Sequence, residues 1–324
     1  MRNLRTEEEI IASWKGDLDK PMVSISCITY NHEFYIEDAL EGFLIQETDF
    51  PFEVLIHDDA STDKTADIIR KYEEKYPKII KPIYQTENQF QKGLKMSPTF
   101  NFPRAKGEYI ALCEGDDYWV ASKKLQTQKD FLDKNTDFGF CFHRVEEVDE
   151  TLIHSAYSAY APLTKNIVTA KDVILNHFIP TLSLFFRVKL ITRNLDKFKG
   201  TFISGDIFIE VLLASQGDGF CFHELMGVYR HHDGGLTKSK DDINKKIRSI
   251  ENYRSLYIEL MNVVPKKYFK YIKLRAVLSV DVPLMRIKIA ENNFFEFIKL
   301  FFGAFYKSPL WPFAVIKIIN KRCL

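Results

Sequence analysis

Residues 108–120 read EYIALCEGDDYWV, and this stretch decides the fold. Its first half, EYIALC, is a short apolar run of the kind that forms a buried strand. The run ends in the turn EGDD, residues 114–117, which places three acids within four positions. Ligands of parallel α/β sheets bind beyond the carboxyl ends of the strands. The turn is therefore a candidate binding site for a ligand that compensates its negative charge.

The sequence before this turn predicts alternating strands and helices. Strands are expected at 22–29, 52–57, 79–84 and 108–113, with helices at 33–46 and 63–76 between them. This order is typical of a parallel sheet with right-handed crossovers. Pro82 cannot donate a ladder hydrogen bond, so it predicts an edge position for the third strand. Ser61 or Thr62 is expected to cap the helix that follows.

The second half of the chain predicts a helix near 122–134, strands at 138–143 and 181–187, and a helix at 207–217. FCFHELMGVYRHH, residues 220–232, predicts two strands joined by a short turn. From about residue 240 the pattern changes to long helical segments. Three regions are expected. They are an N-terminal extension (1–20), an α/β domain with a mainly parallel sheet (21–238), and a basic, aromatic-rich helical region (239–324).

Composition indicates a folded, water-soluble protein. The chain has 324 residues, of which 46% are hydrophobic and 27% charged, which is ordinary for a globular protein. Its five cysteines form no CxxC pair, so they indicate buried thiols in a reducing compartment. The polar N-terminus lacks a signal-peptide core, and no uncharged apolar run approaches the roughly 18 residues of a membrane span. A cytoplasmic location is therefore predicted.

The net charge of +1 hides an asymmetry along the chain. Residues 240–324 hold 17 Lys and Arg against 7 Asp and Glu, whereas the remainder carries an excess of nine acids. Residues 292–322 mix Phe, Leu, Ile and Trp with lysines, a pattern typical of a helix at a membrane interface. This predicts peripheral contact with the inner face of the plasma membrane. The alternative is that these helices pack on the catalytic domain with their lysines in solvent. No nucleic-acid reader motif is present, so no nucleic acid is expected as a partner.

Two acidic clusters follow two of the predicted strands. Asp58 and Asp59 come after FEVLIH, and the EGDD turn comes after EYIALC. Each cluster alone is an ordinary solvated turn. Two clusters at one sheet edge favour a divalent cation, because carboxylate oxygens suit Mg²⁺ and Mn²⁺. Mg²⁺ takes much of its shell from phosphate oxygens, so the implied ligand is a metal-bound diphosphate.

At this point the sequence resembles a known family. PMVSISCITYNHEFYIEDAL, VLIHDDASTDKTADII and AKGEYIALCEGDDYW are similar to the signatures of family 2 glycosyltransferases with the GT-A fold, over roughly residues 21–235. The resemblance implies a Rossmann-like α/β fold and a nucleotide-diphosphate sugar as donor, such as a UDP-, dTDP- or GDP-sugar. It also implies a divalent metal, inversion at the anomeric carbon, and a saccharide or lipid-linked acceptor in the synthesis of a bacterial surface polysaccharide.

The resemblance assigns nucleotide contacts to two loops. Thr29, Tyr30 and Asn31 match the loop that lies against the nucleotide in this family. Asp58 and Asp59 match the second nucleotide-binding loop, and Asp59 takes the position of the residue that hydrogen-bonds the base.

The resemblance also assigns the metal. The EGDD turn matches the DxD-like motif, with Glu114 and Asp116 near the ribose, Asp116 also near the metal, and Asp117 as the metal ligand. YRHHDGG resembles the element YRxHxGG and gives His232 a second ligand position. A neutral imidazole can ligate Mn²⁺, and a protonated one can bind the diphosphate. A hydrogen-bonded loop histidine is the alternative.

A catalytic base is expected late in the chain. Direct displacement needs a carboxylate that takes the proton of the acceptor hydroxyl. Asp206, in TFISGDIFIEVL, resembles the catalytic Asp of the family. Without the resemblance, an Asp at the start of a helix indicates a cap.

Two other readings compete with this assignment. A sugar-nucleotide pyrophosphorylase would need a glycine-rich, basic loop near the N-terminus, which VSISCITYNHE lacks. A membrane-associated partner that kept the fold but lost catalysis is disfavoured, because Asp59, Asp117 and Asp206 are all present.

Overall fold

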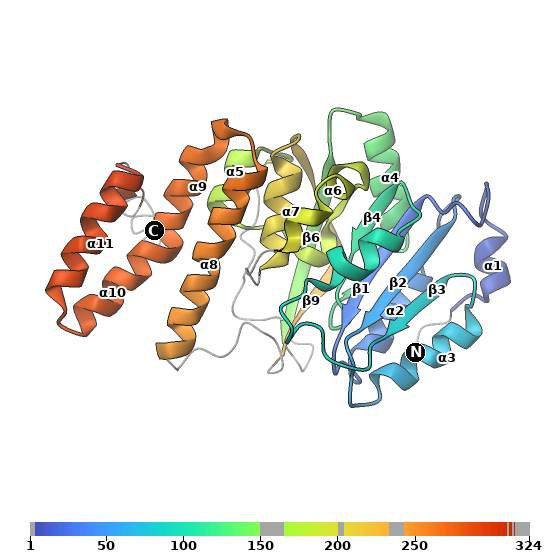
Figure 1. The fold of residues 1–324 in the computed structure, drawn as a ribbon. Helices are drawn as coiled ribbons and strands as arrows, with labels where there is room; N and C mark the ends of the chain where they lie inside the picture. The colour runs from blue at the N-terminus through green and yellow to red at the C-terminus, as the bar shows by residue number, and fades with distance from the viewer. Residues whose placement is uncertain are drawn as a thin grey trace. The chain divides into compact units, whose positions relative to one another are not determined.

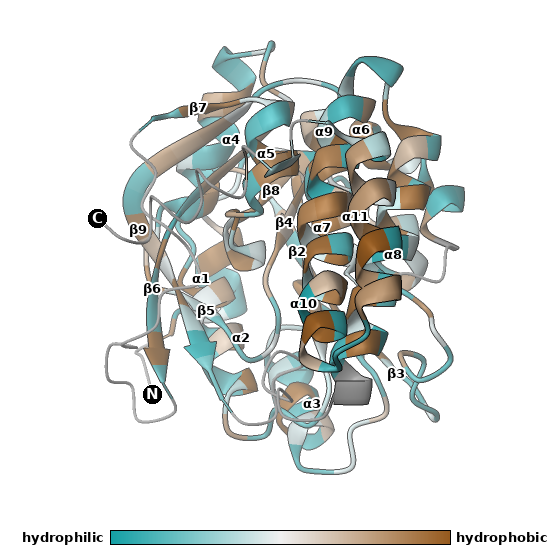
Figure 2. Cartoon of the chain, turned by 90° about the vertical axis from the view of Figure 1, so that its left-hand side faces the viewer, coloured by the Kyte–Doolittle hydropathy of each residue, from teal (hydrophilic) through white to brown (hydrophobic). Residues whose placement is uncertain are grey.

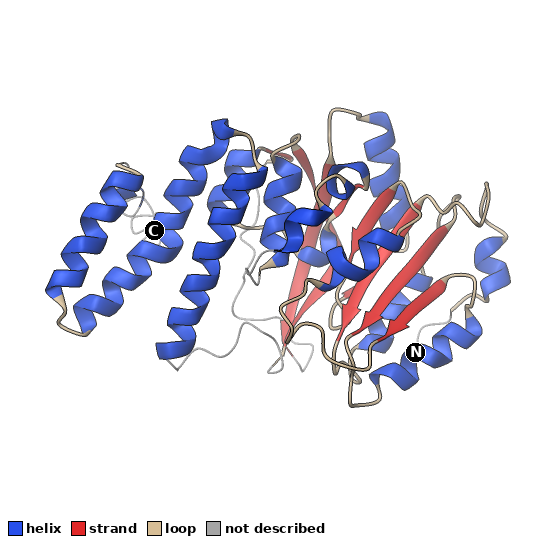
Figure 3. Cartoon of the chain, in the orientation of Figure 1, coloured by secondary structure: helices blue, strands red, loops and turns tan. Residues whose placement is uncertain are grey.

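The computed structural model describes residues 4–149, 165–199, 204–232, 243–309, 311, 312 and 314. Within it the chain forms two compact units (Figures 1 and 3). The first comprises Met1–Thr169, Phe178–Lys199 and Gln216–Asp233, and the second comprises Ala170–His177, Gly200–Ser215 and Gly234–Leu324. The predicted boundary at residue 238 lies outside the described residues. Two earlier segments of the chain belong to the second unit, so no single position divides the two.

The first unit is an α/β unit. Its strands are β1 (Val23–Thr29), β2 (Phe52–Asp58), β3 (Ile80–Tyr84), β4 (Tyr109–Leu112), β5 (Tyr118–Trp119), β6 (Phe140–Asp149), β7 (Ile167–Val168), β8 (Phe185–Arg187) and β9 (Gly219–His231). Its α-helices are α1 (Glu7–Ile11), α2 (Ile36–Leu44), α3 (Thr65–Lys75), α4 (Lys124–Lys134) and α6 (Lys189–Thr192).

These strands form one mixed sheet in the order β3-β2-β1-β4-β8-β6-β9-β5, with β7 paired to β9. Strands β1 to β4 are parallel to one another, as expected, and β3 is at the edge, as Pro82 predicts. Beyond β4 the sheet departs from the mainly parallel arrangement, because β8 runs antiparallel to both β4 and β6. The fold is nevertheless the predicted α/β class with a helical C-terminal region.

One buried amide and one close backbone approach fix the spacing of the parallel strands. The buried amide of Asn101 donates to Ser26 Oγ and to the carbonyls of Cys27 and Leu55, each at 3.1 Å. It thus ties β1 to β2. Gly107 permits a second close approach, since a Cβ there would lie 2.6 Å from the backbone nitrogen of Ser24. Only glycine fits at this point, where the chain that enters β4 passes β1.

Two local predictions are wrong. Residues 220–232 do not form two strands, because β9 runs unbroken beside β6. The pairing of β6 with β9 shifts register near His143 and Arg144, so the strand continues where a turn was expected. Neither Ser61 nor Thr62 caps α3. The position before the helix is Lys64, and the backbone N–H of Thr65 is instead satisfied by the carboxylate of Asp63. Asp63 takes the place of a capping Ser or Thr, because its short side chain can accept a hydrogen bond from the backbone N–H two residues further along the chain.

The second unit is helical. It consists of α5 (Ala170–Asn176), α7 (Gly205–Ala214), α8 (Ile243–Val263), α9 (Phe269–Ala276), α10 (Val282–Ala290) and α11 (Phe294–Lys307). A π-helical turn, Val277–Asp281, joins α9 directly to α10. Among the described helices none combines the length and apolar character needed to cross a membrane.

The first unit buries an unusual cation. Lys124, in α4, is fully buried, and its Nζ donates to Gln128 Oε1 at 2.8 Å and lies 3.8 Å from the ring centroid of Trp119. Burial lowers the pKa of Lys124 to about 7. In the unfolded chain a lysine pKa is about 10.4. Between these values the unfolded state holds a proton that the folded state has released, so stability rises with pH.

Lys124→Met should remove this pH dependence. From pH 7 to 8.5 we expect the wild-type free energy of unfolding to rise by about 1 kcal/mol per pH unit more than that of the variant. Urea denaturation across this range measures both slopes. Lys123→Met is the control, because Lys123 is exposed and should keep the wild-type slope. Parallel slopes for wild type and Lys124→Met would show that Lys124 stays charged in the folded protein.

Candidate active site

The acidic turn extends the β4 edge alongside β1. Beyond the end of β4, the N–H of Cys113 donates to the carbonyl of Ser26 and that of Gly115 to the carbonyl of Ile28. A Cβ on Gly115 would lie 2.7 Å from Thr29 Oγ1, so a side chain at this position would push the turn away. The predicted first-strand loop and the EGDD turn are therefore in contact at the carboxyl edge of the sheet.

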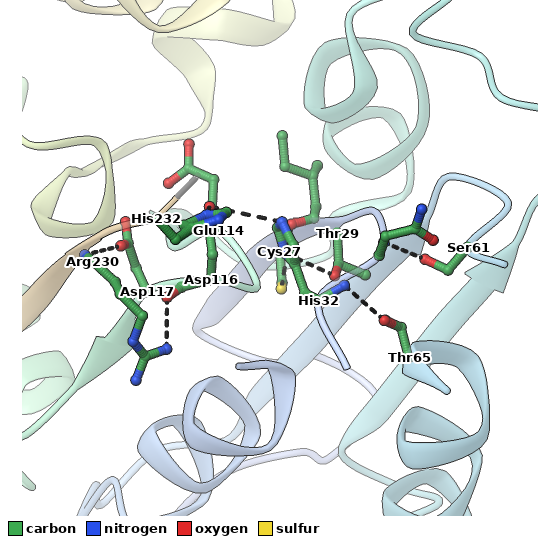
Figure 4. Close-up of polar contacts among 12 residues, drawn as sticks. Cys27, Thr29, His32, Ser61, Thr65, Glu114, Asp116, Asp117, Arg230 and His232 are labelled. Carbon is green, nitrogen blue, oxygen red and sulfur yellow. Dashed lines mark hydrogen bonds and ion pairs between the residues drawn. The ribbon is translucent and has the colours of Figure 1, made fainter. Parts of the chain in front are cut away.

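Three side chains converge above this contact (Figure 4). His232 Nε2 lies 3.0 Å from Asp116 Oδ2, and His32 Nε2 lies 3.7 Å from the same oxygen. One ligand atom from each residue lies within 4.8 Å of those of the other two. We call these three residues the His-Asp-His cluster. Among the described residues it is the group of His, Cys, Asp and Glu that can hold a metal ion.

The cluster keeps its carboxylate ionised. Burial opposes ionisation of Asp116, but the hydrogen bond from His232 and the charges of both imidazoles outweigh it and lower the pKa of Asp116. The pKa of His32 is lowered, chiefly by burial, although Asp116 opposes this. Asp116 Oδ1 is buried and makes no hydrogen bond within the described structure. The cluster thus presents an anionic oxygen that has no donor among the described residues.

Asp117 lies on the other side of the turn. It is buried, and its Oδ1 accepts the backbone N–H of Arg230 at 2.9 Å. The reason is strand pairing, since β5 begins at the next residue and pairs antiparallel with β9. Burial, together with the charges of Asp116 and Glu114, raises the pKa of Asp117 well above its ordinary value. Asp117, the ligand expected from the resemblance, is not part of the His-Asp-His cluster.

Arg230 connects the turn to helix α2. Its side chain is 3% exposed, and its guanidinium donates to the carbonyl of Asp116 at 2.9 Å and to Asp38 Oδ2 at 2.7 Å. It also lies 4.9 Å from the ring centroids of Tyr35 and Tyr118. The Tyr35 ring in turn packs 4.8 Å from the ring of His232. One buried cation thus orients both the acidic turn and a residue of the cluster.

The first predicted nucleotide loop is cross-linked to the second. Thr29 Oγ1 lies 3.2 Å from His32 Nδ1, which fixes the His32 ring. The backbone N–H of Asn31 donates to Ser61 Oγ, and Asn31 Oδ1 accepts from the N–H of Thr62. Asn31 takes a positive φ of 55° to make these bonds. Tyr30 makes no such bond within the described structure, and 40% of its surface is exposed.

The two acids of the second predicted nucleotide loop, Asp58 and Asp59, are buried and hydrogen-bonded to the protein. Asp58 is buried and accepts from Ser61 Oγ at 2.5 Å, and burial raises its pKa. Asp59 is also buried, and its two carboxylate oxygens accept the backbone N–H groups of Gln89 and Phe90 at 2.7 and 3.0 Å. Asp59 therefore anchors the loop that follows β3.

Asp206 belongs to the second unit. It lies in the first turn of α7 and is exposed, while the position before the helix is Ser204. Asp206 is therefore not the N-cap that its sequence position also suggested. One turn later Glu210 is buried, and burial followed by the charge of Asp206 raises the pKa of Glu210 well above its ordinary value.

Sequence reasoning missed two residues of this site. His32 follows the first strand by three residues, and only its position beside the acidic turn reveals a role. Arg230 stands inside YRHH, next to the predicted His232, and its charge beside an acidic region was the available signal.

The Arg230–Asp38 contact predicts a measurable coupling. Asp38→Asn removes the carboxylate partner of a buried guanidinium and should lower the free energy of unfolding by about 1 kcal/mol, since Asp38 itself is 49% exposed. Asp67→Asn is the matched control, because its Arg70 partner is exposed and such pairs contribute about 0.3 kcal/mol. Chemical denaturation of both variants decides the question, and equal losses would contradict a special role for Asp38.

Curated relatives are similar to this chain over about half to two thirds of its length. An uncharacterised protein of Mycobacterium tuberculosis, Rv1520, is 37% identical over 218 residues, which is 67% of this chain and 61% of the relative. A putative teichuronic acid biosynthesis glycosyltransferase of Bacillus subtilis, TuaG, is 34% identical over 156 residues, or 48% of this chain and 60% of the relative. The chain thus matches about 60% of the length of these relatives.

The fold is shared with a solved structure. The structure of S. aureus TarS 1–349 in complex with UDP-GlcNAc superposes with a TM-score of 0.65 at 18% identity, over 89% of this chain and 81% of that one. The sequence profile of glycosyl transferase family 2 matches residues 24–193, which carry β1 to β8 and the acidic turn. This chain is a member of glycosyl transferase family 2.

Proposed function

We propose that this protein transfers a sugar from a nucleotide-diphosphate donor to a saccharide or lipid-linked acceptor, with inversion at the anomeric carbon. The donor is a UDP-, dTDP- or GDP-sugar. The observation that supports this most directly is the His-Asp-His cluster, which lies at the carboxyl edge of the sheet beside both predicted nucleotide loops. Ligands of open α/β sheets bind at this edge.

The residues of the cluster fit a divalent cation. One carboxylate and two imidazoles are a donor set that Mn²⁺ accepts, and the buried Asp116 Oδ1 is still without a donor among the described residues. His32, Asp116 and His232 would hold the ion, and Asp117, the ligand that the resemblance implies, is the alternative. When bound, the ion would neutralise the charge that develops on the leaving diphosphate.

The protein side chains supply the remaining functions. Asp59 fixes the loop after β3. We assign Asp58 and Asp59 to the nucleoside site together with Thr29, Tyr30 and Asn31 of the loop bonded to theirs, and Glu114 to the ribose. Asp206 accepts the proton of the acceptor hydroxyl while that oxygen attacks the anomeric carbon. Asp206 lies in the first turn of α7 without being its N-cap, and desolvation of the carboxylate raises its pKa, which suits a proton acceptor.

The pathway proposed is the synthesis of a surface polysaccharide, such as a capsule, O-antigen or lipopolysaccharide. The name of the B. subtilis relative, which refers to teichuronic acid biosynthesis, supports this. We place the protein in the cytoplasm, peripherally associated with the inner face of the plasma membrane, where a lipid-linked acceptor would be available.

Metal binding tests the cluster. We expect Mn²⁺ to bind in the presence of UDP, and a panel of UDP, dTDP and GDP to raise the melting temperature only when Mn²⁺ or Mg²⁺ is present. His32→Ala and His232→Ala should each weaken Mn²⁺ binding at least tenfold in isothermal titration, because each removes a ligand. Asp117→Asn keeps an acceptor for Arg230 and should leave Mn²⁺ affinity within about threefold. If Asp117→Asn weakened Mn²⁺ binding and His32→Ala did not, Asp117 would be the metal ligand and His32 would not.

Asp206→Asn should separate donor binding from transfer. The substitution retains size but removes the base, so we expect transfer to fall by roughly 10²–10⁴-fold. The increase in melting temperature with UDP and Mn²⁺ should be unchanged. Glu210→Gln, one turn further along the same helix, is the control and should keep near-native transfer. Near-native transfer by Asp206→Asn would exclude Asp206 as the base, and loss of UDP binding would give it a structural role instead.

A further inference from the structure

Helix α11 is apolar on both of its faces. Its inner face carries Phe297, Leu300, Phe301 and the buried Ala304, which pack in one cluster with Val277, Met285 and Trp311. Its outer face carries exposed hydrophobic side chains, which we call the aromatic stripe. They are Phe294 (61% exposed), Phe295 (77%), Ile298 (51%), Phe302 (65%), Phe305 (48%) and Tyr306 (91%).

The stripe is a concentrated feature. Among the described residues there are fifteen exposed large hydrophobic side chains, and six of them lie on this one helix of 14 residues. Residues 295, 298, 302 and 305 are spaced by three or four positions, so they share one side of the helix. A helix at a protein surface normally turns polar residues outward. In Figure 2 α11 and its neighbour α10 are largely brown.

Positive charge accompanies the stripe in the same unit. Residues 240–324 carry 17 basic against 7 acidic residues. Four exposed lysines in and beside α9 have no carboxylate partner within the described structure: Lys266, Lys267, Lys270 and Lys273. Anionic lipid headgroups attract such lysines. A second copy of this chain would bring the same surplus of positive charge to the stripe, and repulsion disfavours that occupant.

We infer that α11 is a membrane-docking helix that lies in the plane of an anionic bilayer. The aromatic stripe enters the boundary between headgroups and acyl chains, and the lysines of the same unit contact the headgroups. Phe and Tyr suit this boundary because their rings are large and rigid, and Tyr306 adds a hydroxyl that can stay hydrated. The inference does not depend on the proposed glycosyl transfer, since neither the His-Asp-His cluster nor Asp206 takes part in it.

Vesicle sedimentation of the full chain tests the stripe. We expect wild-type protein to bind vesicles that contain 30 mol% phosphatidylglycerol, and to bind phosphatidylcholine vesicles at least fivefold more weakly. The double variant Phe295→Ser with Phe302→Ser should lose at least tenfold in binding. The control is Phe34→Ser with Ile258→Ser, which removes two hydrophobic side chains of 81% and 52% exposure outside the stripe and should bind as wild type.

The same sedimentation assay tests the lysines, and light scattering without lipid tests the competing occupant. Replacing Lys266, Lys267, Lys270 and Lys273 by Gln should abolish the preference for phosphatidylglycerol while weak binding to phosphatidylcholine persists. Equal sedimentation of wild type and the stripe variant would overturn the inference. So would a wild-type dimer in light scattering without lipid that the stripe variant converts to monomer, because a second copy would then cover the stripe.

Discussion

The contact between Arg230 and the acidic turn organises the site. A guanidinium that is 3% exposed donates to the main chain of Asp116 and to Asp38, while its own N–H binds Asp117. This arrangement lowers the electrostatic repulsion among the carboxylates of Asp38, Asp116 and Asp117, because each lies in a fixed electrostatic environment of its own. Asp117 is kept inward and its pKa is raised, whereas the pKa of Asp116 is lowered beside two imidazoles. Asp117 therefore has a structural role in the turn, and Asp116 is available to a ligand.

The sequence was informative where structure follows from neighbours along the chain. The apolar runs located β1 to β4, and Pro82 located the sheet edge. It was less informative where a distant strand decides the outcome. Nothing near Asp117 shows that β5 pairs with β9, yet that pairing turns its side chain toward Arg230. The unbroken course of β9 has the same origin, because its length is set by its partner β6.

The candidate site shows the same limit. His232 and Asp116 were predicted from local motifs, and the structure brings them to 3.0 Å. His32 could not be assigned in advance, since the acid that its ring faces, Asp116, is 84 positions away and lies within reach only once β1 and β4 are adjacent. The inward bonds of Asp59 were equally hidden, because they depend on the path of the loop after β3. Residue types in the sequence indicated which side chains could bind a ligand. Tertiary packing determined which of their atoms remain available for binding.

The composition of the second unit has a practical consequence. Helices α5 and α7 come before the end of the sheet in the chain, but their neighbours in space are α8 and α9. Val173, Ile174, Phe208, Val211 and Leu212 are all nearly inaccessible to solvent there. A chain shortened after β9 would therefore not yield a minimal catalytic domain. It would uncover these apolar faces, and the product should be recovered from inclusion bodies rather than from the soluble fraction of a lysate.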